Sequence, residues 1–356
     1  MKNVIVKSQE ELDNTKSLLD KQFPTYRQAY SDRTAWLMAC LSELVYLKFN
    51  EPILNGKKAK LIKNVSKLID EQKMSSLNKL IDMLAYDSEE EKAKLKADLE
   101  ILNMKIEKTF DVDGTQAMIV SSEKFYVLAF RGTEPTSIKD IKSDIKATTK
   151  KCETGGMIHS GFDEAFDLVQ LDIQETLDSL ETDKPLFIAG HSLGGALATV
   201  ATKKLTFKFG IAGCYTFGSP RVGDEGWIMG IKTPVYRLVN SADPVTMVPP
   251  SGVIIKTITF ILKFFPILKP IEKFLSRFAG YHHAGDMRYL TNIQDGDFNS
   301  VKLLNNVTIL RRLRSFINKQ VPWSKIPSDH SITTYRKKLQ VIAWNRQDME
   351  YVRKEN

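Results

Sequence analysis

The spacing of hydrophobic positions divides the chain into an early helical part and a later part in which strands alternate with helices. Within residues 30–47, Leu37, Leu41 and Leu44 recur at the spacing of one helix face. Residues 56–103 are rich in Lys, Glu and Leu at helical spacing, which predicts two or three surface helices. We interpret this second stretch as an insertion ahead of the main fold.

The period of the pattern changes after residue 103. Three short β-rich runs predict strands at 104–110, 115–120 and 125–130, and Asp113-Gly114 is a turn signal between the first two. Further along, in chain order, the pattern predicts a helix at 164–180, a strand at 185–189, a helix from Leu193, and strands near 214–217 and 235–240. This alternation predicts an α/β fold with a mostly parallel central sheet and helices on both faces.

Composition narrows the class of protein. The 356 residues are 42% hydrophobic and 26% charged, which excludes disordered, collagen-like and coiled-coil chains. The three cysteines are too few and too scattered for a disulfide framework, and no Cys/His group has the spacing of a zinc site. We therefore expect a globular fold with no structural metal.

Two further patterns bear on location. The start of the chain has only three consecutive apolar residues, Val4 to Val6, and no apolar run of 18 residues is free of charge. We therefore expect neither a secretory signal nor a membrane-spanning helix. The expected location is the cytoplasm, or outside the cell after export by a route that needs no signal peptide, with membrane association open.

The excess positive charge lies in one late segment. The net charge is +8, and residues 251–325 carry 12 Lys and Arg against four acidic residues. Residues 253–278 alternate apolar pairs with lysines, and 303–317 repeats the pattern with three arginines. Such stretches suit peripheral contact with an anionic lipid surface through 253–317, although a core helix with solvated lysines or a cover against another subunit fits equally well. No nucleic-acid motif accompanies the charge, so we expect no nucleic-acid partner.

The sharpest chemical signal is Gly190-His191-Ser192-Leu193-Gly194, which follows an apolar strand and opens a helix. A serine between two glycines fits a strained strand-to-helix turn that projects its hydroxyl. The alternative is a tight structural turn. The predicted strand before it and the Ala/Leu-rich helix after it favour a nucleophile.

A nucleophilic serine needs a base, and the base needs an orienting carboxylate. Asp243 follows an apolar strand, is fixed by Pro244 and lies in a polar loop, although alone it would be an ordinary turn aspartate. The histidines His282, His283 and His330 follow Asp243, as the chain order of an α/β-hydrolase requires. Spacing does not choose among them.

Five stretches together carry a family resemblance. They are FIAGHSLGGALA (187–198), YTFGSPRVGD (215–224), NSADPVTMVPP (240–250), AFRGTE (129–134) and IHSGF (158–162). In their order along the chain they resemble the class 3 lipases, the fungal-lipase-like branch of the α/β-hydrolases, which includes plant phospholipase A1 enzymes. The resemblance covers roughly residues 28–50 and 104–345.

The resemblance implies an α/β-hydrolase fold with a mostly parallel central sheet. It suggests one domain over residues 1–345, with a helical N-terminal insertion at 51–103, a cationic amphipathic insertion at 251–280 and a C-terminal tail at 346–356. No cofactor is implied.

The resemblance also assigns the base. PSDHSITTY (327–335) resembles the family's late segment, in which Ile-Pro precedes the catalytic histidine and a tyrosine follows it. GYHHAGDMRYL (280–290) resembles a segment that is structural in the fungal enzymes. We therefore expect Ser192, Asp243 and His330 to form the catalytic triad, with His283 as the alternative base and His159 of IHSGF as a structural residue.

An oxyanion needs two preorganised donors. One is expected from the backbone N–H of Leu193, at the start of the predicted helix, and the resemblance implies Thr133 as the second. The stretch that corresponds to the family's lid, 135–151, holds only three isoleucines among many Lys and Asp. This polar lid together with the cationic 253–317 region favours polar or anionic lipids over neutral fat.

Taken together, the sequence predicts a serine hydrolase that cleaves carboxylic esters of lipids, as a triacylglycerol lipase or esterase, through an acyl-enzyme. One alternative is a phospholipase A1 that acts on anionic membrane lipid. A second alternative is a non-catalytic lipase-like scaffold that binds lipid or a partner protein. Retention of the three triad residue types favours an enzyme over a scaffold.

Overall fold

The structure is a computed structural model that describes a defined part of the chain. It covers residues 3–20, 23–25, 29–48, 65–71, 74, 87–132, 149–241, 243–249, 280–293, 297–308, 311–312, 314 and 326–355. Thr133, most of the lid stretch 135–151, the amphipathic stretch 253–278 and most of 56–86 lie outside these residues, so the expectations for them remain predictions.

The core of the fold is an eight-stranded sheet in the order β1-β2-β3-β6-β7-β9-β11-β12. The five strands from β3 to β11 run parallel to one another, and β1, β2 and β12 join the two edges antiparallel. Their bounds are β1 Lys105–Val112, β2 Thr115–Ser121, β3 Tyr126–Phe130, β6 Leu186–His191, β7 Ile211–Phe217, β9 Val235–Asn240, β11 Asp286–Leu290 and β12 Leu303–Asn305. The predicted mostly parallel sheet is confirmed.

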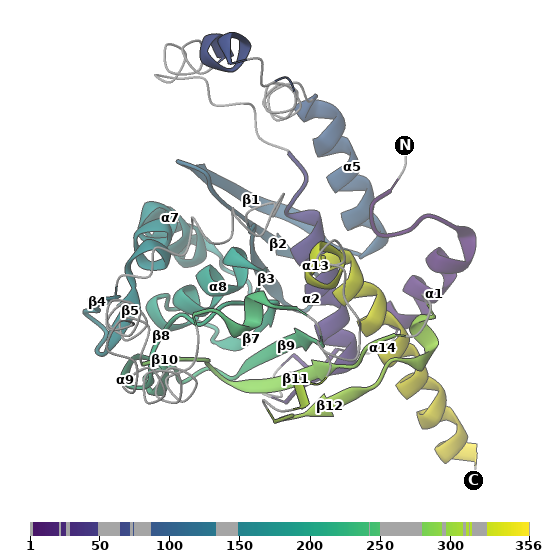
Figure 1. The fold of residues 1–356 in the computed structure, drawn as a ribbon. Helices are drawn as coiled ribbons and strands as arrows, with labels where there is room; N and C mark the ends of the chain where they lie inside the picture. The colour runs from purple at the N-terminus through teal and green to yellow at the C-terminus, as the bar shows by residue number, and fades with distance from the viewer. Residues whose placement is uncertain are drawn as a thin grey trace.

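Helices cover both faces of this sheet (Figure 1). Helices α7 (Ser160–Ser179) and α8 (Leu193–Lys204) pack on one face, and α2 (Asp32–Leu44) and α14 (Ile332–Glu355) lie on the other. Successive strand residues point to opposite faces, so each strand contributes to two hydrophobic cores. The result is the three-layer arrangement that the alternation of strands and helices predicts.

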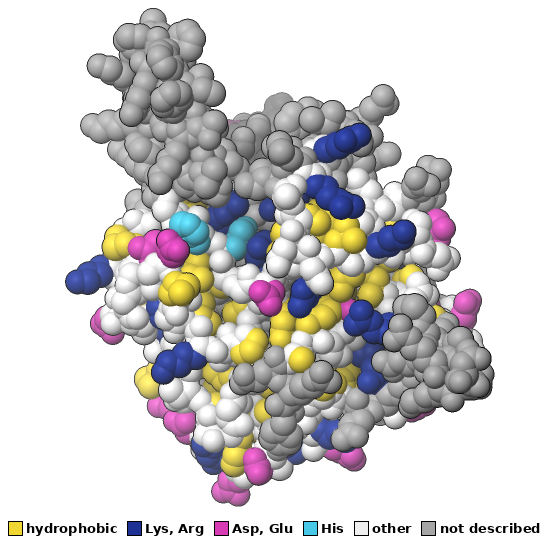
Figure 2. Space-filling model, turned by 90° about the horizontal axis from the view of Figure 1, so that it is seen from below, with side chains coloured by type: hydrophobic (Ala, Val, Ile, Leu, Met, Phe, Trp, Pro, Cys, Tyr) yellow, Lys and Arg dark blue, Asp and Glu magenta, His cyan; other side chains and the backbone are white. Residues whose placement is uncertain are grey.

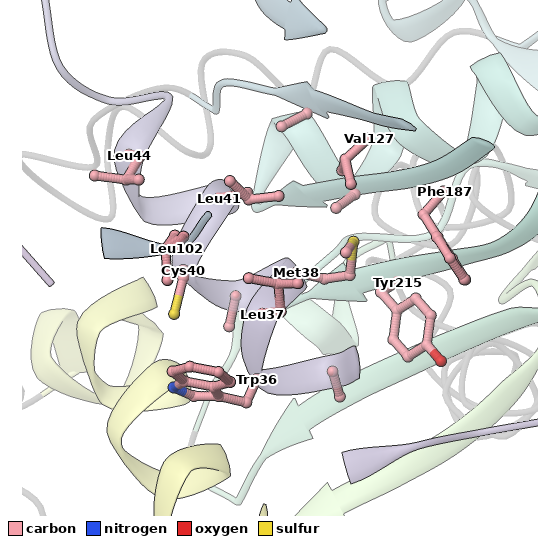
Figure 3. Packing of buried hydrophobic residues seen from close by; sticks show 14 of the residues in the cluster. Trp36, Leu37, Met38, Cys40, Leu41, Leu44, Leu102, Val127, Phe187 and Tyr215 are labelled. Carbon is pink, nitrogen blue, oxygen red and sulfur yellow. The ribbon is translucent and has the colours of Figure 1, made fainter. Parts of the chain in front are cut away.

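Helix α2 is buried almost throughout because it lies between the sheet and α14. Met38 points toward Tyr215 of the sheet, whereas Trp36 points the other way, toward α14 (Figure 3). The helix begins later than the predicted 30–47, because Ser31 is extended and its hydroxyl accepts a hydrogen bond from Thr34 N at 3.3 Å.

Helix α5 (Ser88–Ile101) lies within the predicted helical insertion, where most of its residues are exposed or half-buried and one face is buried. Leu95 and Leu99 are buried in the same core as α2. The carboxylate of Asp98 accepts hydrogen bonds from the backbone N–H groups of Val4 and Ile5, at 2.8 and 3.1 Å. The helix therefore ties the N-terminal segment to the main fold.

A second, four-stranded sheet has the order β10-β8-β5-β4. Its strands are β4 Thr149–Lys151, β5 Met157–His159, β8 Gly223–Asp224 and β10 Tyr281–His282. The remaining described elements are α1 Gln9–Leu19, α9 Glu225–Met229, η1 Val245–Met247, η3 Phe298–Ser300 and α13 Ile326–His330. Helix α14 continues past residue 346, the predicted start of a tail, and Arg346 pairs with Asp32 at 2.8 Å.

Candidate active site

Ser192 occupies the single residue between β6 and α8. Its backbone has φ 58° and ψ −126°, a strained conformation for a residue with a side chain. The turn is tight enough that a Cβ at Gly190 would overlap the backbone of Gly194. Ser192 N donates to Phe217 O at 2.9 Å, which fastens the turn to β7. The predicted strand-to-helix turn is confirmed.

Three distant residues meet at this turn. His330 Nε2 lies 2.8 Å from Ser192 Oγ, and His330 Nδ1 lies 2.8 Å from Asp243 Oδ2. Their exposed fractions are 4% for Ser192, 1% for His330 and 0% for Asp243. With its Nδ1–H donated to the carboxylate, the imidazole has Nε2 free to accept the serine proton. The structure therefore brings together the three residues that the resemblance selected.

The other two histidines after Asp243 lie elsewhere. His283 Nε2 is 2.8 Å from the Thr246 carbonyl, and its pKa is lowered well below the usual value by burial and by neighbouring arginines. His282 is exposed, with its Nδ1 2.7 Å from Gly280 O. Neither is placed between Ser192 and Asp243 as His330 is.

Asp243 is held on both of its oxygens. Oδ1 accepts from the backbone N–H of Val245 at 2.9 Å, while Oδ2 accepts from the Tyr335 hydroxyl at 2.7 Å as well as facing His330. The Tyr335 hydroxyl in turn accepts from Asn240 N at 2.9 Å. The sequence placed a tyrosine after the catalytic histidine but gave it no role, because Tyr335 and Asp243 are 92 positions apart in the chain and local spacing does not reveal their contact.

His330 is also held through its backbone. Its carbonyl oxygen lies 2.6 Å from His191 Nε2, and His191 Nδ1 lies 2.9 Å from the Tyr46 hydroxyl. Burial, followed by the proximity of His330, lowers the pKa of His191 well below its usual value, so this imidazole is neutral. A neutral ring has one N–H, which Nε2 donates to the His330 carbonyl while Nδ1 accepts from Tyr46. This support was also missed, because Tyr46 and His191 are far apart in the sequence.

The two expected oxyanion donors are only partly covered by the structure. Leu193 is the first residue of α8, where a backbone N–H has no partner within the helix. Thr133 lies outside the described residues. The residue before it is described: a Cβ added at Gly132 would lie 3.2 Å from Ser192 Cβ, so the chain passes beside the serine just before Thr133.

His159 lies in the second sheet, apart from the serine. Its ring stacks on Phe162 with 4.0 Å between centroids, and neither ring nitrogen has a hydrogen-bond partner. Burial lowers its pKa to about 4. These contacts fit the structural role expected for it.

Among the described residues, no group of three or more His, Cys, Asp or Glu is arranged to hold a metal ion. Over the same part of the chain, every helix is too short or too polar to span a bilayer.

Comparison with known proteins finds similarity to lipases over part of the chain. Residues 127–253 match the family model described as lipase (class 3). The chain is 33% identical over 141 residues to a secreted mono- and diacylglycerol lipase 1 of Fusarium solani, covering 36% of this chain and 41% of that protein. It is 33% identical over 156 residues to the chloroplastic phospholipase A(1) DAD1 of Arabidopsis thaliana, covering 36% and 34%. The match thus spans less than half the length of these relatives.

The fold has a solved counterpart. A crystal structure of a mono- and diacylglycerol lipase from Aspergillus oryzae matches 79% of this chain and 88% of its own, with a TM-score of 0.50 and 20% sequence identity. At this identity the likeness concerns the fold alone. It agrees with the α/β-hydrolase architecture that the sequence predicts.

Proposed function

Because its residues 127–253 belong to the class 3 lipase family of α/β-hydrolases, we propose that this chain is a serine hydrolase that cleaves carboxylic ester bonds of lipids. The observation that carries the proposal is the continuous hydrogen-bonded chain from Ser192 Oγ through the His330 ring to the Asp243 carboxylate. Each link is 2.8 Å long, and all three residues are buried.

The geometry supports the following acylation step. Ser192 Oγ attacks the ester carbonyl carbon while its proton passes to His330 Nε2, and the carbonyl oxygen becomes an oxyanion. Asp243 stabilises the resulting imidazolium. His330 then gives the proton to the leaving alkoxide as the carbon–oxygen bond breaks, which leaves an acyl group on Ser192.

Deacylation uses the same residues in reverse. His330 takes a proton from a water molecule, the hydroxide attacks the acyl carbon, and Ser192 leaves with the proton from His330. The backbone N–H of Leu193 is the proposed oxyanion donor at the helix start, and Thr133 is the proposed second donor. The close passage of Gly132 beside Ser192 supports that position for the loop.

The proposed substrate is a glyceride ester, since one matching relative is named a mono- and diacylglycerol lipase. Phospholipase A1 activity is the second candidate, because another relative carries that name and the 251–325 segment concentrates the positive charge of the chain. We also propose peripheral contact with a lipid surface through 253–317. Figure 2 shows one face of the described residues, on which hydrophobic side chains lie among Lys, Arg, Asp and Glu.

The single-domain organisation with insertions at 51–103 and 251–280 is part of the proposal. The two hydrophobic layers share one sheet, and α1, α2, α5 and α14 pack into the same core, which supports one domain rather than two.

Hydrolysis of p-nitrophenyl butyrate, diolein and phosphatidylglycerol by the full chain tests the function. We expect Ser192→Ala and His330→Ala to lower kcat by at least about a thousand-fold on any ester that the chain cleaves. His283→Ala is the matched control, a second inward-facing histidine near Asp243, and it should keep activity within about ten-fold of the parent. A scaffold would show no activity in the parent, and a His283 base would reverse the order of the two histidine variants.

A further inference from the structure

Three buried arginines gather behind the loop that carries Asp243. Arg221, Arg237 and Arg312 come from separate parts of the chain and have exposed fractions of 6%, 8% and 5%. Burial and the positive charge of the others lower the pKa of Arg221 to about 10 and that of Arg237 to about 9. All three guanidinium groups are therefore charged at neutral pH. We call these three residues the arginine cluster.

The contacts of the cluster leave several donors unused. Arg221 Nη1 donates to Met247 O at 2.7 Å and to Pro249 O, and Arg312 Nη2 donates to the Thr246 hydroxyl. Arg237 Nε and Nη1 and Arg312 Nε are buried and have no hydrogen-bond partner. The cluster thus presents unsatisfied N–H groups from two different side chains.

Counter-charge is also missing. Across the described part of the chain, no carboxylate lies within ion-pairing distance of the three guanidinium groups. The described carboxylate that acts on them from further away is Asp243, on Arg312. Its two oxygens are already bound by His330, Tyr335 and Val245.

A buried arginine elsewhere in the described part of the chain has a counter-charge, unlike the arginine cluster. Arg336 is as deeply buried, and its Nε binds the carboxylate of Glu43. An unpaired buried charge is costly, and buried ions in proteins are paired or bind an ion of opposite sign. The arrangement therefore calls for an anion that the described part of the chain does not supply.

We propose that Arg221, Arg237 and Arg312 form a binding site for a phosphate-type oxyanion. Guanidinium groups bind phosphate oxygens through pairs of N–H donors, and three positive charges suit a phosphate monoester or free phosphate better than a single carboxylate. The small residual exposure of the three residues favours a small anion or one lipid headgroup over a macromolecule.

The site is connected to the proposed triad through one residue. Arg312 donates to the Thr246 hydroxyl, which donates to the backbone carbonyl of Asp243 at 2.9 Å, and His283 faces the Thr246 carbonyl. An anion held by the arginine cluster would neutralise the charge next to this loop and steady the position of Asp243. The binding itself does not depend on whether the chain is a hydrolase.

Thermal unfolding of the full chain in chloride and phosphate buffers of equal ionic strength at pH 7 tests the site. We expect the Tm of the parent to rise by about 5 °C at saturating phosphate and not with chloride. Arg237→Met should have a Tm equal to or above that of the parent in chloride, because it removes an unpaired charge, and should lose the phosphate response. This reversal of order is not expected of a merely structural arginine.

Two controls keep the test decisive. Arg288 lies on the adjacent strand and stacks on Tyr30, outside the arginine cluster. The variant Arg288→Met should therefore keep the full phosphate response. If Arg237→Met fails to fold, calorimetric titration of phosphate into the parent and into Arg312→Gln replaces it. No phosphate response in the parent, or an equal response in the parent and Arg237→Met, would overturn the site.

Vesicles separate the two sources of the phosphate group. If a lipid headgroup is bound, the parent should sediment with phosphatidylcholine vesicles containing phosphatidic acid more than with vesicles of equal charge containing phosphatidylglycerol. Free phosphate should compete, and Arg237→Met should lose the difference. If free phosphate is bound, the Tm response should be present while sedimentation is the same for the two vesicles and for both proteins.

Discussion

Buried charges are treated in opposite ways in two regions of the molecule. Between α2 and α14, the Arg336 guanidinium binds the Glu43 carboxylate. Burial acts to lower the pKa of Arg336, but pairing with Glu43 outweighs it, and the pKa is raised. Behind the Asp243 loop, burial and neighbouring arginines lower the pKa of Arg237 instead.

The contrast separates two uses of the same residue type. A buried arginine with its own carboxylate joins elements of the fold, as Arg336 joins α14 to α2. A buried arginine without a carboxylate partner can bind an anion, because its unpaired N–H groups are left to donate hydrogen bonds to that anion. The exposed fraction of the side chain does not distinguish these two kinds of buried arginine. The presence or absence of a carboxylate partner does.

The largest effect is expected at Asp243. Its carboxylate accepts a hydrogen bond from Tyr335 of α14, and its charge acts on Arg312 of the arginine cluster. Asp243→Asn removes the charge that stabilises the imidazolium and allows the amide to favour the wrong tautomer of His330. We expect kcat for a p-nitrophenyl ester to fall about 10⁴-fold with a nearly unchanged fold. Circular dichroism and Tm of the variant provide the control. A fall of less than ten-fold would remove Asp243 from the proposed triad.

Breaking the paired region comes next. Glu43→Ala leaves Arg336 buried without its carboxylate, and we expect the free energy of unfolding to fall by about 3–5 kcal/mol. The double variant Glu43→Leu with Arg336→Met should recover most of this loss, because it removes both charges. Denaturant unfolding of the three proteins measures it. If Glu43→Ala lowered the free energy of unfolding no more than Arg237→Met does in chloride, the two regions would not differ as we describe.

A buried neutral group gives a third environment, in which stability depends on pH. The pKa of His159 is lowered to about 4 by burial, so below about pH 6.5 the unfolded chain binds a proton that the folded chain does not. Its contribution to stability is therefore lost as the pH falls from about 6.5 to about 4, by about 3 kcal/mol.

Unfolding free energies at pH 7, 5.5 and 4 check this sign. His159→Phe should show a shallower fall with decreasing pH than the parent, whereas His282→Ala, an exposed histidine, should follow the parent. The shifts of His191 and His283 have the same direction, so some pH dependence should remain in His159→Phe. Parallel curves for His159→Phe and the parent would contradict the assignment.

The smallest effect is expected at Tyr335, a positioning residue. Tyr335→Phe removes the hydroxyl that donates to Asp243 and leaves Asn240 N–H without its acceptor. We expect a fall in kcat of about five- to ten-fold with an unchanged KM, because one hydrogen bond to a charged group is lost in the active site. Phe217→Leu is the packing control, because the Phe217 ring contacts Tyr335. It should not lower kcat at an unchanged KM as Tyr335→Phe does.

Local patterns were enough to predict most of the sheet and the serine turn. Period-two runs and a glycine-flanked serine are properties of neighbouring residues, and β9 (Val235–Asn240) begins and ends where the sequence predicted. The charged composition around Leu95 and Leu99 predicted the surface position of α5 but not which face it buries. There, two leucines four residues apart face the core while the many Lys and Glu of the helix face outward.

Only those residues of the candidate site that lie within recognisable sequence motifs could be predicted. The choice between His283 and His330 needed either a family resemblance or the coordinates, because both follow Asp243 at permissible distances along the chain. The contact of Tyr46 with His191 and the gathering of the arginine cluster depend on how distant segments fold together, and neither has a signature in local spacing.

The position of α13 and α14 has a consequence for synthesis of the protein. His330 ends α13, and Tyr335 lies in the first turn of α14, the helix that packs along α2, so Ser192 and Asp243 are translated long before their partners. A ribosome-bound chain that has emerged only through η1 would hold a strained serine without a base. Under the proposed function, onset of ester cleavage in a cell-free translation reaction would therefore report docking of α13 and α14.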